Sequence, residues 1–68
     1  MNKTYNKLRG KIIEVFGAHY LFAKALGISE NSLSKKLTGK TQFKQSDITK
    51  WCQLLEIPIE EAGNYFFS

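Results

Sequence analysis

Four hydrogen-bonding side chains, Glu30, Asn31, Ser34 and Lys35, recur at a spacing that places them on one face of a helix. An asparagine can form paired hydrogen bonds with adenine, a lysine can donate to guanine, and a glutamate can accept from the amino group of cytosine. A helix that carries such side chains outward can reach base edges in the major groove of DNA. Glu30 has a second interpretation, because a carboxylate in a first helical turn also complements the helix dipole.

Residue types that support catalysis or metal binding do not occur in complete sets. His19 is the only histidine, and it has no histidine or cysteine companion at ligand spacing. The sequence offers no group of nucleophile, base and orienting residue. Cys52 is the only cysteine, so it forms no internal disulfide, and we expect it to be a small core residue. We therefore expect a protein that is not an enzyme and that uses no metal and no cofactor.

The elements that must position these side chains are predicted to be helical. Apolar residues recur at helical spacing, and glycine or serine marks the ends of most segments. With Ser29 and Ser46 as N-caps, the pattern predicts helices over residues 3–16, 19–26, 30–38, 46–55 and 59–66. The predicted fold class is all-α, a compact bundle of four to five short helices in a single domain covering residues 1–68.

Two of these helices meet through a tight turn. The first needs a small residue where the second approaches it, and Ala23 meets that need. Gly27 suits the turn, because glycine tolerates a positive φ. Leu33 lies six residues beyond the glycine and would anchor the second helix beneath the first. This combination predicts a helix-turn-helix with residues 30–38 as the recognition helix.

The charge is unevenly distributed along the chain. The formal net charge is +4, yet residues 1–50 hold all ten lysines and arginines against three acids, a net +7. Residues 51–68 hold three glutamates and no basic residue. Such asymmetry favours a polyanion as partner, with solubilising lysines as the plain alternative. No apolar run approaches the ~20 residues of a membrane span and the first residues lack a secretory signal, so we expect a cytoplasmic protein without a membrane partner.

The motif that runs from Ala23 to Lys40 can be written A-x-x-x-G-(I)-S-x-x-(S)-L-S-x-x-L-x-G-K. It resembles the Cro/CI-type helix-turn-helix family, also called the xenobiotic-response-element family, and the L-L-E-I-P segment resembles the end of that family's fourth helix. The resemblance implies a lambda-repressor-like DNA-binding domain similar to small regulators of temperate phages. One departure is that the second anchor of the recognition helix is Leu37, because the usual position holds Lys36. The loop of residues 41–45 also looks about one residue longer than is usual.

The resemblance also implies a set of DNA contacts. Glu30, Asn31, Ser34 and Lys35 match positions that face the bases. The positions that face the phosphates are matched by His19, Tyr20, Ser29, Lys36, Thr38, Lys40, Thr41 and Lys44. Ser29 has an alternative role as the helix cap, and Lys36 has one as surface cover.

The function expected from these features is that of a sequence-specific, double-stranded-DNA-binding transcriptional regulator, a phage-type repressor or Cro-like switch protein. Since one short helix reads few base pairs, we expect a homodimer on DNA. The aromatic side chains of Tyr65, Phe66 and Phe67 could supply the dimer or partner contact, or could pack back on the first helix. The alternative function is a protein-interaction module that binds and modulates a partner repressor.

Overall fold

The computed structural model describes residues 5–67, and its first helix, α1, spans Asn6–Phe16. The helix begins later than the sequence predicts, because Tyr5 adopts a left-handed conformation with φ 52°. Residues 3 and 4 of the predicted helix lie outside the described residues. Gly17 ends α1 with φ 86°, a conformation that glycine adopts without strain.

The next two helices, α2 (His19–Leu26) and α3 (Glu30–Leu37), form the predicted helix-turn-helix pair. Gly27 turns the chain between them with φ 76°. Its N–H donates to the carbonyl of Lys24 at 3.1 Å, and the N–H of Ile28 donates to that of Ala23 at 3.0 Å. These two bonds satisfy the last carbonyls of α2 in the manner of a Schellman motif. The boundaries of α2 are as predicted, whereas α3 ends one residue earlier, at Leu37.

The fourth helix, α4, spans Gln45–Leu55 and does not use its predicted cap. Ser46 lies inside the first turn. The carboxylate of Asp47, near the start of the helix, instead accepts the backbone N–H of Lys44 at 3.0 Å. The tail divides into a short 3₁₀ turn, η1 (Ile59–Glu61), and a last helix, α5 (Ala62–Phe66). The five α-helices confirm the all-α class, and each regular element within residues 5–67 is helical.

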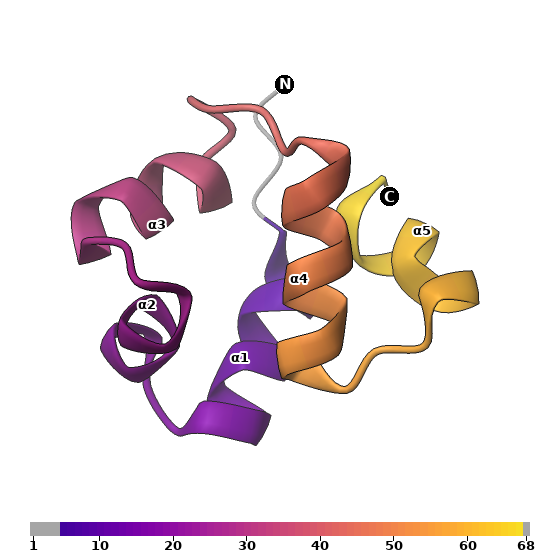
Figure 1. Cartoon of the computed structure of the whole chain (residues 1–68), viewed down its shortest axis with the longest axis horizontal. Helices are drawn as coiled ribbons and strands as arrows, with labels where there is room; N and C mark the ends of the chain where they lie inside the picture. The colour runs from indigo at the N-terminus through magenta and orange to yellow at the C-terminus, as the bar shows by residue number, and fades with distance from the viewer. Residues whose placement is uncertain (1–4, 68) are drawn as a thin grey trace.

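Side chains from all five α-helices share one core. In Figure 1, α4 stands at the centre of the view, with the α2–α3 pair on one side and α5 on the other. Trp51 of α4 meets Phe22 of α2 edge-on, with ring centroids 4.8 Å apart. The largest fully buried side chains are those of Trp51, Phe22, Leu8, Ile12, Leu33, Leu37 and Leu55. Among the helices of this described part of the chain, none combines the length and apolar character needed to cross a membrane.

Candidate nucleic-acid interface

The third helix has one buried face and one exposed face. Leu33 and Leu37 are each about 1% exposed and pack into the core, which confirms Leu37 as the second anchor. The predicted base-reading residues are all exposed on the remaining surface of α3: Glu30, Asn31, Ser34 and Lys35. The structure therefore exposes these four side chains along one helix, and Glu30 and Ser34 also line a pocket between α3, α1 and the start of α2.

Ser29 acts as the N-cap of this helix. Its Oγ accepts the backbone N–H of Ser32 at 3.1 Å, and its hydroxyl lies 3.1 Å from that of Ser32. This hydrogen bond satisfies one of the amides left open at a helix start. The capping interpretation of Ser29 is thus confirmed, and its oxygen is engaged within the protein.

The C-terminal end of α3 is closed by backbone hydrogen bonds around Gly39. The N–H of Gly39 donates to the carbonyl of Lys36 at 3.3 Å, and the N–H of Lys40 donates to that of Lys35 at 2.9 Å. Thr38 donates its hydroxyl proton to the carbonyl of Ser34 at 2.9 Å. Because a threonine hydroxyl has one proton, Thr38 cannot also donate to a phosphate while this bond persists.

The predicted phosphate contact by Lys36 is corrected, because its side chain is engaged within the protein. Its Nζ lies 3.0 Å from Oδ2 of Asp47 and donates to the carbonyl of Gln42 at 3.4 Å, and its side chain is only 16% exposed. The same carboxylate accepts the N–H of Lys44, which lowers the pKa of Asp47, and the ammonium of Lys36 lowers that pKa further. Lys36 therefore faces α4 and joins two helices instead of facing outward.

The loop after α3 carries the remaining predicted phosphate contacts. Lys40, Thr41 and Lys44 are exposed along it. Phe43, in contrast, turns inward and contacts Trp51 and Phe66 with ring centroids 4.9 and 5.0 Å apart. The loop thus presents two lysines and a threonine to solvent while its aromatic residue is held in the core.

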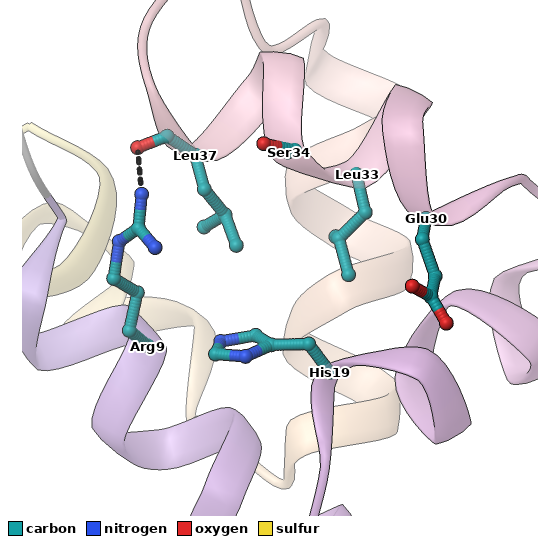
Figure 2. Close-up of a pocket in the computed structure, with 6 residues that line it drawn as sticks. All are labelled: Arg9, His19, Glu30, Leu33, Ser34 and Leu37. Carbon is teal, nitrogen blue, oxygen red and sulfur yellow. Dashed lines mark hydrogen bonds between the residues drawn. The ribbon is translucent and has the colours of Figure 1, made fainter.

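His19, a predicted phosphate contact, lies at a pocket. Figure 2 shows a pocket of about 220 Å³ between α1, the start of α2 and α3, lined by Arg9, His19, Glu30, Leu33, Ser34 and Leu37. The imidazole points into this pocket, and its buried Nε2 has no hydrogen-bond partner among residues 5–67. The Nε2 edge of His19 is therefore enclosed within the protein, beside the pocket that Glu30 and Ser34 also line. Tyr20, the next residue, is 56% exposed and remains open to a phosphate contact.

Arg9 is a positioning residue that the sequence analysis missed. Its guanidinium, at the opposite side of the pocket from Glu30, donates to the carbonyl of Leu37 at 3.0 Å (Figure 2). This carbonyl belongs to the last turn of α3, where helix carbonyls lack partners within the helix. The bond therefore fixes the end of α3 against α1. One feature of the sequence indicates this inward role. Arg9 directly follows the buried Leu8, so it lies at the border of the apolar stripe of α1.

The aromatic tail is only partly available to a partner. Phe66 is 2% exposed and packs against Trp51 and Phe43, so the predicted partner contact by Phe66 is corrected to a core role. Tyr65 is half-buried, with the ammonium of Lys7 lying 5.0 Å from its ring centroid. Phe67 is 66% exposed. The expected packing against the first helix is seen for Tyr65, through Lys7, whereas the ring contacts of Phe66 are with Trp51 of α4 and Phe43 of the loop.

Comparison with known proteins gives one family match. The model of a family described as "Protein of unknown function (DUF739)" matches residues 1–68, the full length of the sequence. A comparison with curated proteins finds no match.

Proposed function

The chain belongs to the DUF739 family, whose description states no function, and from the geometry of α3 we propose that it is a sequence-specific transcriptional regulator that binds double-stranded DNA. In this proposal α3 enters the major groove. Asn31 and Lys35 read base edges, and Ser34 and Glu30 contribute hydrogen bonds beside them. Lys40, Thr41 and Lys44 on one flank and Tyr20 on the other contact the phosphates.

The observation that carries the proposal is the two-faced character of α3. Leu33 and Leu37 hold the helix to the core, while Asn31, Ser34 and Lys35 stand exposed together. The turn at Gly27 and the Ser29 cap set where this helix begins relative to α2. A short helix held in this way offers hydrogen-bonding groups on a rigid element, which is what base reading requires.

The narrower assignment is to the Cro/CI type, as a phage-type repressor or Cro-like switch protein. It is supported by the motif from Ala23 to Lys40, whose glycine, cap and two leucine anchors perform the structural tasks that the motif implies. A regulator of this type would act in the cytoplasm of its host cell.

The test is a selection of bound duplexes from a random pool, followed by titration of the winning duplex and a scrambled one. We expect the selected duplex to bind at least about a hundredfold more tightly, since specific complexes exceed non-specific ones by roughly 10³-fold or more. We also expect affinity to fall steeply with salt, because phosphate contacts release counterions. Equal affinity for the scrambled duplex would contradict sequence-specific regulation.

We further propose that the protein binds DNA as a homodimer, because one helix of this length reads few base pairs. Ile59 and Phe67, which are 58% and 66% exposed, supply apolar surface at the C-terminal end of the molecule. The selected duplexes should then contain two half-sites related by symmetry and about one helical turn apart. A single half-site bound by one chain would contradict this arrangement.

The same exposed apolar side chains support a second candidate function, a module that binds and modulates a partner repressor. In that case the isolated chain would enrich no duplex from the random pool. It would instead change the DNA affinity of the partner repressor when the two proteins are mixed. The random-pool selection therefore separates the two candidates.

A further inference from the structure

One carboxylate oxygen, on Asp47 of α4, joins the end of α3 to the end of the loop that follows it. Oδ2 of Asp47 lies 3.0 Å from Nζ of Lys36 in the last turn of α3 and accepts the backbone N–H of Lys44, just before α4, at 3.0 Å. Lys36 adds a bond of 3.4 Å to the carbonyl of Gln42 within the loop. The Lys36 and Asp47 side chains are 16% and 28% exposed, so the pair is partly shielded from water.

The loop that these bonds span carries the exposed Lys40, Thr41 and Lys44. Its beginning is fixed by the amides of Lys40 and Thr41, which both donate to the carbonyl of Lys35, at 2.9 and 3.2 Å. Its far end is fixed where Phe43 enters the core and where Asp47 holds the Lys44 amide. A loop held at both ends loses little conformational entropy when it binds a ligand, which favours affinity.

We infer that Asp47, acting through Lys36 and the Lys44 amide, is a positioning residue that holds the phosphate-contacting loop in its DNA-binding conformation. The inference rests on the proposed function and deepens it. Asp47 is an acid beside a surface proposed to bind a polyanion, so electrostatics by itself would make its neutralisation strengthen DNA binding. A positioning role requires the opposite sign: neutralisation must weaken binding.

The direction of the change in DNA affinity is tested with Asp47→Asn. This variant keeps an oxygen that can accept the Lys44 N–H but removes the charge that holds Lys36. We expect this variant to bind all duplexes roughly three- to tenfold more weakly, in line with the loss of one partly shielded ion pair, and to keep the base preference of the parent. Glu60→Gln is the matched control, since it neutralises an exposed acid on η1. The control should bind as tightly as the parent or slightly more tightly.

A second measurement follows the loop in the protein without DNA. Amide relaxation over residues 38–44 should show greater mobility in Asp47→Asn than in the parent and no change in Glu60→Gln. The double variant Lys36→Gln/Asp47→Asn should bind no more weakly than Lys36→Gln, because the shared contact is lost only once. Loss of affinity together with a loosened loop and this non-additivity supports the inference.

Equal or tighter DNA binding by Asp47→Asn overturns the positioning role and leaves the proposed function intact. If the parent itself binds no duplex, the proposed function fails and the inference falls with it. Should Asp47→Asn fail to fold, Lys36→Gln tests the contact from the other side, with the exposed Lys50→Gln as the control for losing one positive charge. If Lys36→Gln loses more DNA affinity than Lys50→Gln, the result supports the inference. Equal losses of affinity overturn it.

Discussion

Phe43 and Trp51 meet edge to face, with ring centroids 4.9 Å apart and ring planes at 88°. Phe43 also contacts Tyr5, at a centroid distance of 5.4 Å, and Phe66, at 5.0 Å. A residue from the loop between α3 and α4 thus links the start of α1, the centre of α4 and α5. The loop between α3 and α4, which carries the proposed phosphate contacts, is therefore anchored in the aromatic core of the molecule, although most of its residues are polar.

Replacement of this anchor tests how much the loop contributes to stability. We expect Phe43→Ala to lower the free energy of unfolding by about 2–3 kcal/mol, somewhat less than for a fully buried phenylalanine, because the ring loses packing and three aromatic contacts. Urea denaturation followed by the fluorescence of Trp51, the only tryptophan, measures the change. Phe67→Ala, at a side chain that is 66% exposed, should stay within about 0.5 kcal/mol of the parent. Equal effects of the two substitutions would contradict the anchoring role.

Glu56 is a position where the sequence carries backbone strain. It ends α4 with φ 57°, and the N–H of the following Ile57 donates to the carbonyl of Cys52 at 2.9 Å. This is the site at which helices commonly place glycine. A left-handed non-glycine residue costs about 1–2 kcal/mol, partly offset by the extra freedom that glycine gains in the unfolded chain. We expect Glu56→Gly to raise the free energy of unfolding by up to about 1 kcal/mol.

The measurement for Glu56 is again urea denaturation, with Glu56→Gln as the control. Glutamine removes the charge but keeps the strained backbone, so it isolates the small gain from removing an acid near a helix C-terminus. If Glu56→Gln stabilises the protein as much as Glu56→Gly does, the charge and not the backbone is responsible.

At Gly27, in the turn before α3, the opposite substitution is informative, because a left-handed glycine is replaced by a residue with a side chain. Its φ is +76°, and a Cβ built there would meet no atom within 4 Å among the described residues. The penalty of Gly27→Ala is therefore conformational, and we expect a loss of about 1–2 kcal/mol in the free energy of unfolding. Gly10→Ala is a matched control, since Gly10 lies within α1, where alanine is favoured by up to about 1 kcal/mol. A stabilising Gly27→Ala would contradict the left-handed turn.

The sequence predicts the helices best where local signals act within one turn. The boundaries of α2 follow from its apolar spacing and from Gly27, and the start of α3 follows from the Ser29 cap. The start of α4 was misassigned, because Ser46 resembles a cap while Asp47 performs the capping from within the helix. In each of these cases the deciding hydrogen bond spans at most five residues.

The candidate site was harder to predict because its side chains are directed by distant partners. Lys36 has the charge of a phosphate contact, but its direction depends on Asp47, eleven residues away across a loop. Arg9 acts on a carbonyl 28 residues away. Sequence spacing gives the face of a helix on which a residue lies, and it does not give the approach of another helix. The exposed set Asn31, Ser34 and Lys35 was predictable because helical periodicity is sufficient to place it.

Acid pH should weaken the fold through Asp47. The Lys44 amide, and then the Lys36 ammonium, lower the pKa of Asp47 below its ordinary 3.8. A carboxyl group with a depressed pKa stabilises the folded state above its unfolded pKa, and this stabilisation is lost as pH falls through the folded pKa. We expect Asp47→Asn to be less stable than the parent at about pH 6, with a gap that shrinks at about pH 3. A gap of the same size at both pH values, measured by urea denaturation, would assign the effect to packing and not to charge.

Lys35 and Lys40 form a matched pair for the proposed DNA binding, since both are exposed lysines that lie five residues apart on opposite sides of Gly39. Lys35→Ala should weaken binding of the selected duplex by about 1–3 kcal/mol and relax the base preference, because in the proposed complex its side chain faces the bases. Lys40→Ala should weaken the binding of all duplexes alike. It should also make the slope of log affinity against log salt shallower by about one unit, which is the contribution of one phosphate contact. Titration of selected and scrambled duplexes at several salt concentrations distinguishes these results. If the two variants lose affinity with the same salt slope and the same base preference, both lysines contact the DNA phosphates. In that case α3 does not read bases through Lys35.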